Sequence, residues 1–235
     1  MLVIGHRGAA GHAPENTLLS VRRAVELGVD GVEVDVRLVN GELFLLHDET
    51  LARTTGAKGR IYDWQAAALR TLDAGDGEQI PFLREVLAHL PPHLTLHAEM
   101  KGREGIGEAL AGFLKRGAAG AMDAAARTVV SCFDPDPLRA LRRLEPRARI
   151  GLLFADLPAD LDALVEALGP ESLHLSVEGA TREAVARAHA LGLKVLVFTV
   201  NDAQDLKSVL AAGADGVFTD YPGRIREFLR AGASQ

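Results

Sequence analysis

The chain has little of what disulfide-bonded or membrane-spanning proteins require. Its 235 residues include one cysteine, Cys132, so no disulfide can form within the chain. No apolar run reaches the roughly 18 residues of a transmembrane helix, and no charged region followed by an apolar one marks a signal peptide at its start. We therefore expect a soluble protein of a reducing compartment, the cytoplasm.

Clustered positive charge and aromatic residues are also scarce. The chain has 26 Lys and Arg against 32 Asp and Glu, a formal net charge of −6, and the basic residues are scattered. Nucleic acids require a basic patch, so we expect no nucleic-acid partner. Without a basic amphipathic helix or an aromatic cluster we also expect no stable membrane association. The sequence makes no prediction of an oligomeric state.

Apolar residues are plentiful, at 48% of the chain, and they are arranged in short β-rich runs separated by amphipathic segments. This alternation over the whole length predicts βαβ units and a parallel sheet within a single domain, residues 1–235. The expected strands are Leu2–His6, Gly31–Val36, Leu43–His47, Leu94–Glu99, Thr128–Cys132, Arg149–Phe154, Ser172–Ser176, Lys194–Thr199 and Asp215–Thr219.

One of these nine strands is expected to form a hairpin arm. Asn40-Gly41 stands between two apolar runs, which is a strong signal for a two-residue turn between antiparallel strands. Leu43–His47 then returns along the second strand, and eight parallel strands remain. The sequence therefore predicts a (β/α)8 TIM barrel. A doubly wound open sheet is the alternative, but no Gly-x-Gly-x-x-Gly opens the first helix.

A small insertion is expected after the second strand. Residues 49–80 are rich in glycine and contain a short helical run near Trp64–Leu72, ahead of the helix expected at Leu83–Leu90. Long segments on this side of a barrel usually shape the pocket.

Polar residues occupy strand ends, where the active sites of such barrels lie. His6 and Arg7 end the first strand, between two glycines that we expect to allow close approach of the backbone to a ligand. Glu33 and Asp35 are two residues apart in a strand and share one face. The valines between them are expected to pack on helices, so both carboxylates should point inward.

His97, Glu99 and Lys101 likewise share a face of the next parallel strand. Glu99 would thus join Glu33 and Asp35 at the barrel mouth. At an effective dielectric of about 20, two unit charges 4 Å apart repel by roughly 4 kcal/mol, so protons or a metal must neutralise the cluster. Carboxylate oxygens favour a hard divalent cation, Mg2+ or Ca2+. The alternative is an inward salt-bridge network with Arg37 and Lys101.

The hairpin brings a second histidine back to the carboxylates. Pairing through the turn sets Phe44 near Arg37 and Leu46 near Asp35, so His47 lies at their level. Imidazoles transfer protons near neutral pH, and cationic side chains hold phosphate oxygens. Two histidines with Arg7 and Lys101 therefore favour phosphoester chemistry.

Other polar or aromatic side chains also lie at strand ends or inside the predicted barrel. Phe198, Asn201 and Asp220 could line the pocket, but for Asp220 we prefer a cap on the following helix. His97 is expected to support Glu99 from one layer below. His174 is expected to pack in the core.

These residues together resemble the glycerophosphodiester phosphodiesterase family. The matching segments occur in order along the chain: GHRG (Gly5–Gly8), PENT (Pro14–Thr17), EVDV (Glu33–Val36), HDETLARTT (His47–Thr55), IPFLREVL (Ile80–Leu87), EMK (Glu99–Lys101), FTVN (Phe198–Asn201) and GADGVFTDYP (Gly213–Pro222). The family often has tryptophan at the position of Phe198, so the apolar wall remains while the shape of the glycerol pocket changes.

The resemblance implies a metal-dependent enzyme that hydrolyses small glycerophosphodiesters, such as glycerophosphocholine and glycerophosphoethanolamine, to sn-glycerol 3-phosphate and an alcohol. It implies one divalent cation, Mg2+ or Ca2+. It also implies roles for particular residues: His6 and His47 as the acid and base; Glu33, Asp35 and Glu99 as metal ligands; Arg7, Lys101 and Phe198 as substrate or phosphate contacts; and Glu15 and Asn16, at the start of a first helix expected at Glu15–Leu27, as supports of the site.

Two other function classes fit parts of the pattern. A metal-dependent lyase or aldolase barrel would use the carboxylates and a cation but need no second histidine, so His47→Ala would leave its rate intact. A non-catalytic module would bind glycerophosphodiesters through Arg7 and Lys101 without turnover.

Overall fold

The computed structural model describes residues 1–102, 104–118 and 123–232. Eight parallel strands form a ring in which the first strand pairs with both the second and the last. The strands, with one antiparallel addition, β3, are β1 (Leu2–Gly5), β2 (Gly31–Val39), β3 (Glu42–Leu45), β4 (Thr95–Met100), β5 (Thr128–Cys132), β6 (Arg149–Leu153), β7 (Ser172–Ser176), β8 (Lys194–Phe198) and β9 (Gly216–Thr219). The predicted TIM barrel is confirmed, because in this strand order the pairing of β1 with β2 closes the sheet on itself.

The hairpin prediction is also confirmed. β3 runs antiparallel to β2, with Arg37 opposite Phe44, and the backbone N–H of Leu46 donates to the carbonyl of Asp35 at 3.1 Å. β2 is three residues longer than predicted, because its pairing with β3 continues to Val39. This pairing carries the chain back to the barrel mouth at His47.

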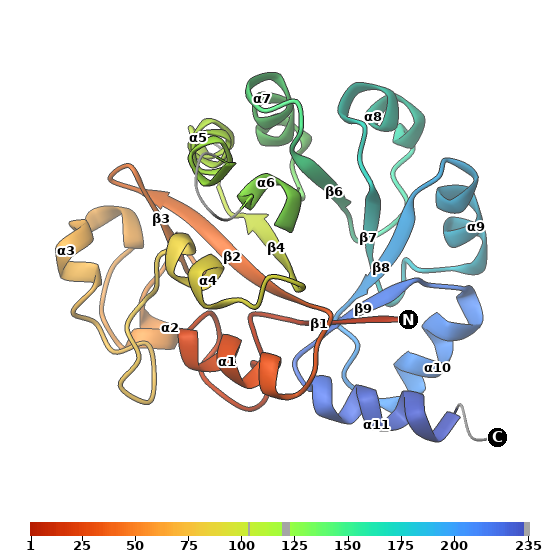
Figure 1. Ribbon diagram of the computed structural model, residues 1–235, viewed down its shortest axis with the longest axis horizontal. Coiled ribbons are helices and arrows are strands. Elements are labelled where there is room, and N and C mark those ends of the chain that lie inside the picture. Colours follow the sequence, from red (N-terminus) through yellow and green to blue (C-terminus); the bar gives the residue numbers. More distant parts are fainter. Residues whose placement is uncertain (103, 119–122, 233–235) are drawn as a thin grey trace.

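Helices surround the strands, as Figure 1 shows. They are α1 (Leu18–Glu26), α4 (Leu83–His89), α5 (Ile106–Ala118), α6 (Ala124–Arg127), α7 (Pro135–Leu144), α8 (Leu161–Leu168), α9 (Arg182–Ala190), α10 (Ala203–Ala212) and α11 (Pro222–Gly232). The first helix was predicted to start at Glu15 but starts at Leu18, because the hydroxyl of Thr17 accepts the Ser20 N–H at 3.1 Å and caps it. Glu15 and Asn16 therefore lie in the loop before the helix.

The main core lies between the strands and the helices. Val32, Val34 and Val36 of β2 are fully buried in it, which leaves the alternate residues of β2 pointing into the barrel. A smaller apolar cluster inside the barrel is formed by Ile4, Leu196, Phe218 and Phe198.

The insertion has a hydrophobic cluster of its own. It contains α2 (Ala52–Thr55), the 3-10 helix η1 (Ile61–Asp63) and α3 (Ala66–Leu69), so the predicted run at Trp64–Leu72 is shorter than expected. The cluster combines residues of the hairpin and of the insertion: Val39, Phe44, Leu46, Leu51, Ile61, Leu69, Ala74 and Ile80. In Figure 1 this part of the chain projects to one side of the barrel, with β3 and α3 together. The hairpin that ends at His47 is thus anchored by the insertion.

None of the helices in the described part of the chain is long and apolar enough to cross a membrane.

Candidate active site

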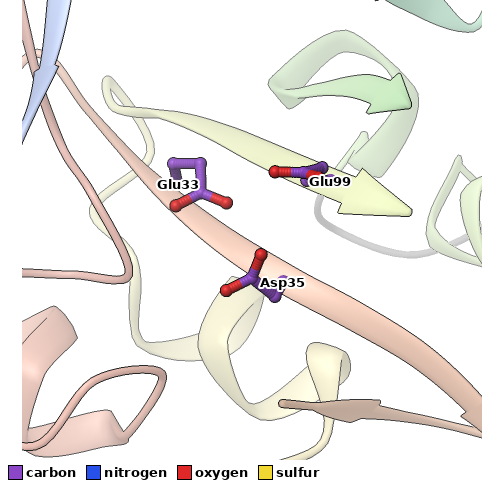
Figure 2. A group of neighbouring side chains, drawn as sticks. All are labelled: Glu33, Asp35 and Glu99. Carbon is purple, nitrogen blue, oxygen red and sulfur yellow. The ribbon is translucent and has the colours of Figure 1, made fainter. Parts of the chain in front are cut away.

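Three carboxylates from β2 and β4 meet at the barrel mouth. The register of the two parallel strands sets Asp35 beside Glu99 and Glu33 beside His97. Oxygens of the three carboxylates lie within 4.8 Å of one another, and Glu33 and Asp35 are buried. Figure 2 shows the three side chains converging from the two strands. The predicted inward orientation is confirmed.

The charges of this trio are not fully compensated by the protein. Burial, together with the charge of Asp35, raises the pKa of Glu33 to about 8. Burial also raises the pKa of Glu99 above its ordinary value, although Lys101 opposes this. One oxygen of Glu33 is buried without a hydrogen-bond partner, whereas Oδ1 of Asp35 forms an ion pair with the Lys101 ammonium at 3.2 Å. Carboxylate oxygens without donors are the ligands that a hard divalent cation prefers, so the trio fits such an ion.

Two cationic side chains flank the trio. The ammonium of Lys101 contacts Glu99 and lies 3.2 Å from Oδ1 of Asp35, and Nε of Arg7 lies 3.1 Å from Oδ2 of Asp35. Although burial favours the neutral acid, the charges of Lys101 and Arg7 lower the pKa of Asp35. Arg37 instead donates to the carbonyls of Leu46 and His47. Of the inward salt-bridge network considered as the alternative, the Lys101 ion pairs are present and an ion pair from Arg37 to the trio is not found in the described part of the chain.

The loop after β1 is held by the residues around it. The backbone N–H of Arg7 donates to Glu33 at 2.8 Å, and its guanidinium donates to Glu15 at 2.9 Å. Asn16 donates to Oδ2 of Asp35 at 2.8 Å and accepts the Asp35 N–H at 3.0 Å. The two residues expected to support the site thus contact a phosphate-binding candidate and a metal-ligand candidate.

The glycines on either side of His6 and Arg7 leave no room for side chains. A Cβ on Gly5 would lie 2.3 Å from the carbonyl oxygen of Gly8, and a Cβ on Gly8 would lie 2.3 Å from the hydroxyl of Ser20. Both positions exclude a side chain because the loop packs against itself and α1. Close approach of the backbone to a ligand at this loop stays a prediction.

His6 is paired with a carboxylate from the last strand of the barrel. Its Nδ1 lies 2.8 Å from Oδ1 of Asp220, and Asn201 donates to the other oxygen at 2.7 Å. The preferred cap role of Asp220 is therefore wrong: its carboxylate faces His6 and Asn201. Burial lowers the pKa of His6, but the hydrogen bond to Asp220 and the charge of Glu33 outweigh it and raise that pKa. A carboxylate only accepts, so Nδ1 carries the proton and Nε2 is left for a substrate.

His47 is paired in the same way. Its Nδ1 lies 2.8 Å from Oδ1 of Asp48, the next residue in the chain. Asp48 is held in turn by Arg53, whose Nε donates to Oδ2 at 2.6 Å. Asp48 and Arg53 were not predicted as functional residues, although both lie within HDETLARTT.

An apolar pocket opens beside the carboxylates. Phe198 lines it, as expected, and meets the ring of Phe133 edge to face at 5.9 Å between centroids. His97 is buried inside the barrel, and it packs against the rings of His174 and Phe218 with Nδ1 unpartnered. His97 thus lies one layer below Glu99, as expected, and no hydrogen bond between the two is found in the described part of the chain, so its support of Glu99 stays a prediction.

Comparison with known proteins identifies the relatives of this chain. A model of the glycerophosphoryl diester phosphodiesterase family matches residues 6–224. The chain belongs to this family. It is therefore a glycerophosphodiester phosphodiesterase, a phosphoric diester hydrolase, as the resemblance implied.

Relatives match over nearly the whole length. A glycerophosphodiester phosphodiesterase of Caldanaerobacter subterraneus is 32% identical over 98% of this chain and 98% of its own. Among solved structures, a phosphodiesterase of Oleispira antarctica in complex with the product sn-glycerol-3-phosphate superposes with a TM-score of 0.90 at 32% identity, covering 98% of this chain and 97% of that one. A glycerophosphodiester phosphodiesterase of Thermotoga maritima gives 0.78 at 28% identity, with 98% of both chains covered.

Proposed function

We propose that this member of the family hydrolyses small glycerophosphodiesters, such as glycerophosphocholine and glycerophosphoethanolamine, to sn-glycerol 3-phosphate and an alcohol. The observation that carries the proposal is the convergence of the carboxylate trio with two carboxylate-held imidazoles and two cationic side chains at one barrel mouth. The product held by the Oleispira antarctica relative supports the glycerol phosphate end.

The trio would hold one divalent cation, Mg2+ or Ca2+. The unpartnered oxygen and the raised pKa of Glu33 support this assignment, because a cation would neutralise this buried carboxylate. When bound, the ion would supply positive charge beside a phosphate that becomes more negative as phosphorus turns five-coordinate. Arg7 and Lys101, on either side of the trio, would hold phosphate oxygens.

His6 and His47 would transfer the protons. In each, Nδ1 is held by a carboxylate, which leaves Nε2 to face the reacting group. One imidazole takes a proton from the attacking nucleophile, and the other donates one to the leaving alkoxide. Glu15 and Asn16 position Arg7 and Asp35. Phe198 lines the wall of the apolar pocket, where the glycerol carbons would pack.

The test is turnover by the pure protein with Mg2+ or Ca2+. Release of glycerol 3-phosphate should be measured from glycerophosphodiesters of choline, ethanolamine, glycerol and inositol, with a lysophospholipid alongside. A higher kcat/KM for the small diesters supports the proposal. No glycerol 3-phosphate, or a clear preference for the lysophospholipid, contradicts it. The cytoplasmic location and the absence of nucleic-acid and membrane partners stay predictions.

A further inference from the structure

Arg53 lies in α2 of the insertion and uses all three guanidinium nitrogens on two carboxylates. Its Nε donates to Asp48 at 2.6 Å, while Nη1 and Nη2 donate to the two oxygens of Glu15 at 2.6 and 2.8 Å. The fork on Glu15 is bidentate, the geometry in which an arginine fixes orientation as well as charge. The two carboxylates lie in different loops, which α1, β2 and β3 separate in sequence.

Each of these carboxylates also accepts a hydrogen bond from a residue with a role in the proposed chemistry. Oδ1 of Asp48 accepts from Nδ1 of His47 at 2.8 Å, and Oε1 of Glu15 accepts from Arg7 at 2.9 Å. A continuous chain of hydrogen bonds therefore runs from His47 through Asp48, Arg53 and Glu15 to Arg7. It joins the loop after β3 to the loop after β1.

The packing of the insertion does not depend on Arg53. α2 has no buried residue, and the side chain of Arg53 is 47% exposed. The apolar cluster of the insertion excludes it. The far end of the insertion is tied to α1 separately, because Glu78 accepts from the N–H of Leu19 at 3.1 Å and from Arg22 at 3.0 Å. Loss of Arg53 should leave the fold in place.

We propose that Arg53 is a positioning residue that sets His47 and Arg7 relative to each other across the barrel mouth. It touches neither the trio nor the pocket, and it acts through Asp48 on one side and Glu15 on the other. What His47 and Arg7 do chemically rests on the proposed function, but their positioning by Arg53 does not.

Arg53→Gln removes the hydrogen bonds to both Asp48 (the His47 arm of the chain) and Glu15 (the Arg7 arm), because a neutral amide cannot span the two carboxylates. Small misplacements of reacting groups cost up to about 100-fold in rate, so kcat/KM should fall by roughly 10- to 100-fold. Asp48→Asn, which cuts the His47 arm, should act mainly on kcat, and Glu15→Gln, which cuts the Arg7 arm, mainly on KM. Arg53→Gln should show both changes, and in an Asp48→Asn background its effect on kcat should shrink.

The matched control is Arg60→Gln. Arg60 is another exposed arginine of the insertion, and it forks onto Asp63 and reaches Glu49 at 3.4 Å without contacting the site. It should leave kcat, KM and Tm close to those of the wild type. Arg53→Gln should likewise keep its Tm, so a lost rate will report position and not unfolding.

A readout independent of turnover is the ¹⁵N spectrum of the His47 imidazole, assigned with His47→Gln. In the wild type, Nδ1 should carry the proton, since Asp48 only accepts. Arg53→Gln frees Asp48 to rotate, so the signals should move toward a mixture of tautomers, while Arg60→Gln should not shift them.

An Arg53→Gln variant with wild-type kinetics and an unchanged His47 spectrum would overturn the inference, as would a loss of rate matched by a fall in Tm. If the wild type itself failed to turn over glycerophosphodiesters, the proposed function would fail, and the imidazole spectrum would still decide the role of Arg53.

Discussion

Replacing Asp220 by asparagine should be more damaging than replacing it by alanine. In the native site, Asp220 bridges His6 and Asn201, with one carboxylate oxygen for each. The orientation of Asn201 is fixed, because its amide oxygen accepts the Asp220 N–H at 2.9 Å and the Thr219 hydroxyl at 3.1 Å. The Asn201 amide nitrogen must therefore keep donating toward residue 220.

An asparagine at 220 has one acceptor where the aspartate has two. Its oxygen is drawn to the fixed donor of Asn201, so its NH2 group points at Nδ1 of His6. Nδ1 must then accept, the proton moves to Nε2, and the imidazole can no longer take a proton from a substrate. The imidazolium is disfavoured as well, because donor faces donor. Alanine imposes neither constraint and leaves both tautomers of His6 accessible.

The size of the effect follows from the contribution of one acid or base group, about 10²–10⁴-fold in kcat. At about 1.36 kcal/mol for each tenfold change, this is about 2.7–5.4 kcal/mol of transition-state stabilisation. We expect Asp220→Asn to lose an amount in this range and Asp220→Ala to lose less.

The assay is the initial rate of glycerol 3-phosphate release from glycerophosphocholine with saturating Mg2+, measured across pH. Although burial lowers the pKa of His6, its bond to Asp220 helps to raise it. With Asp220→Ala the His6 pKa falls, so the limb of kcat/KM that reports it should move to lower pH. An Asp220→Asn variant within tenfold of the wild type, or faster than Asp220→Ala, would refute the reasoning.

Three further outcomes are expected. A chelator should abolish turnover and Mg2+ or Ca2+ should restore it, whereas full activity of Glu33→Gln in metal-free buffer would contradict the cation site. His6→Ala and His47→Ala should each lower kcat. A substrate with a much better leaving group should restore the rate only in the variant that lacks the acid. A near-normal kcat of both variants on a substrate with a poor leaving group would show that the two histidines are structural. Burial lowers the pKa of His174 from 6.5 to about 3, so between these values the unfolded chain binds more protons and stability rises with pH. From pH 5 to 7 the free energy of unfolding, measured by urea melts, should rise by about 2 kcal/mol more in the wild type than in His174→Asn. The same dependence of this free energy on pH in both proteins would contradict the prediction.

The carboxylate trio could be predicted from the sequence because its placement follows from strand alternation. Once Asn40-Gly41 assigns β3 to a hairpin, β4 becomes the parallel neighbour of β2, and Glu99 must lie near Asp35. The turn likewise fixes the return of His47. These inferences need only the period of two and the connection rules.

The carboxylates that hold the histidines could not be found in this way. Asp220 is followed by Tyr221-Pro222, a local pattern typical of a helix start, and its true contact is with a residue at the other end of the chain. The closed barrel does place β9 beside β1, which is the signal that could have indicated it. Asp48 lies in a loop and Arg53 in the short helix α2, which has no buried face, so no sequence pattern predicts the contacts of their side chains.

The bond between His6 and Asp220 spans 214 positions of the chain. β1 also has its longer pairing, four residue pairs, with the last strand, and only two with β2. During synthesis, His6 is made 214 residues before the carboxylate that holds its Nδ1. A partly made chain therefore has an open sheet edge and a His6 imidazole without its orienting carboxylate, even when its other strands have paired. Hydrolytic activity should appear only with barrel closure, which makes it a sensitive reporter of completed folding.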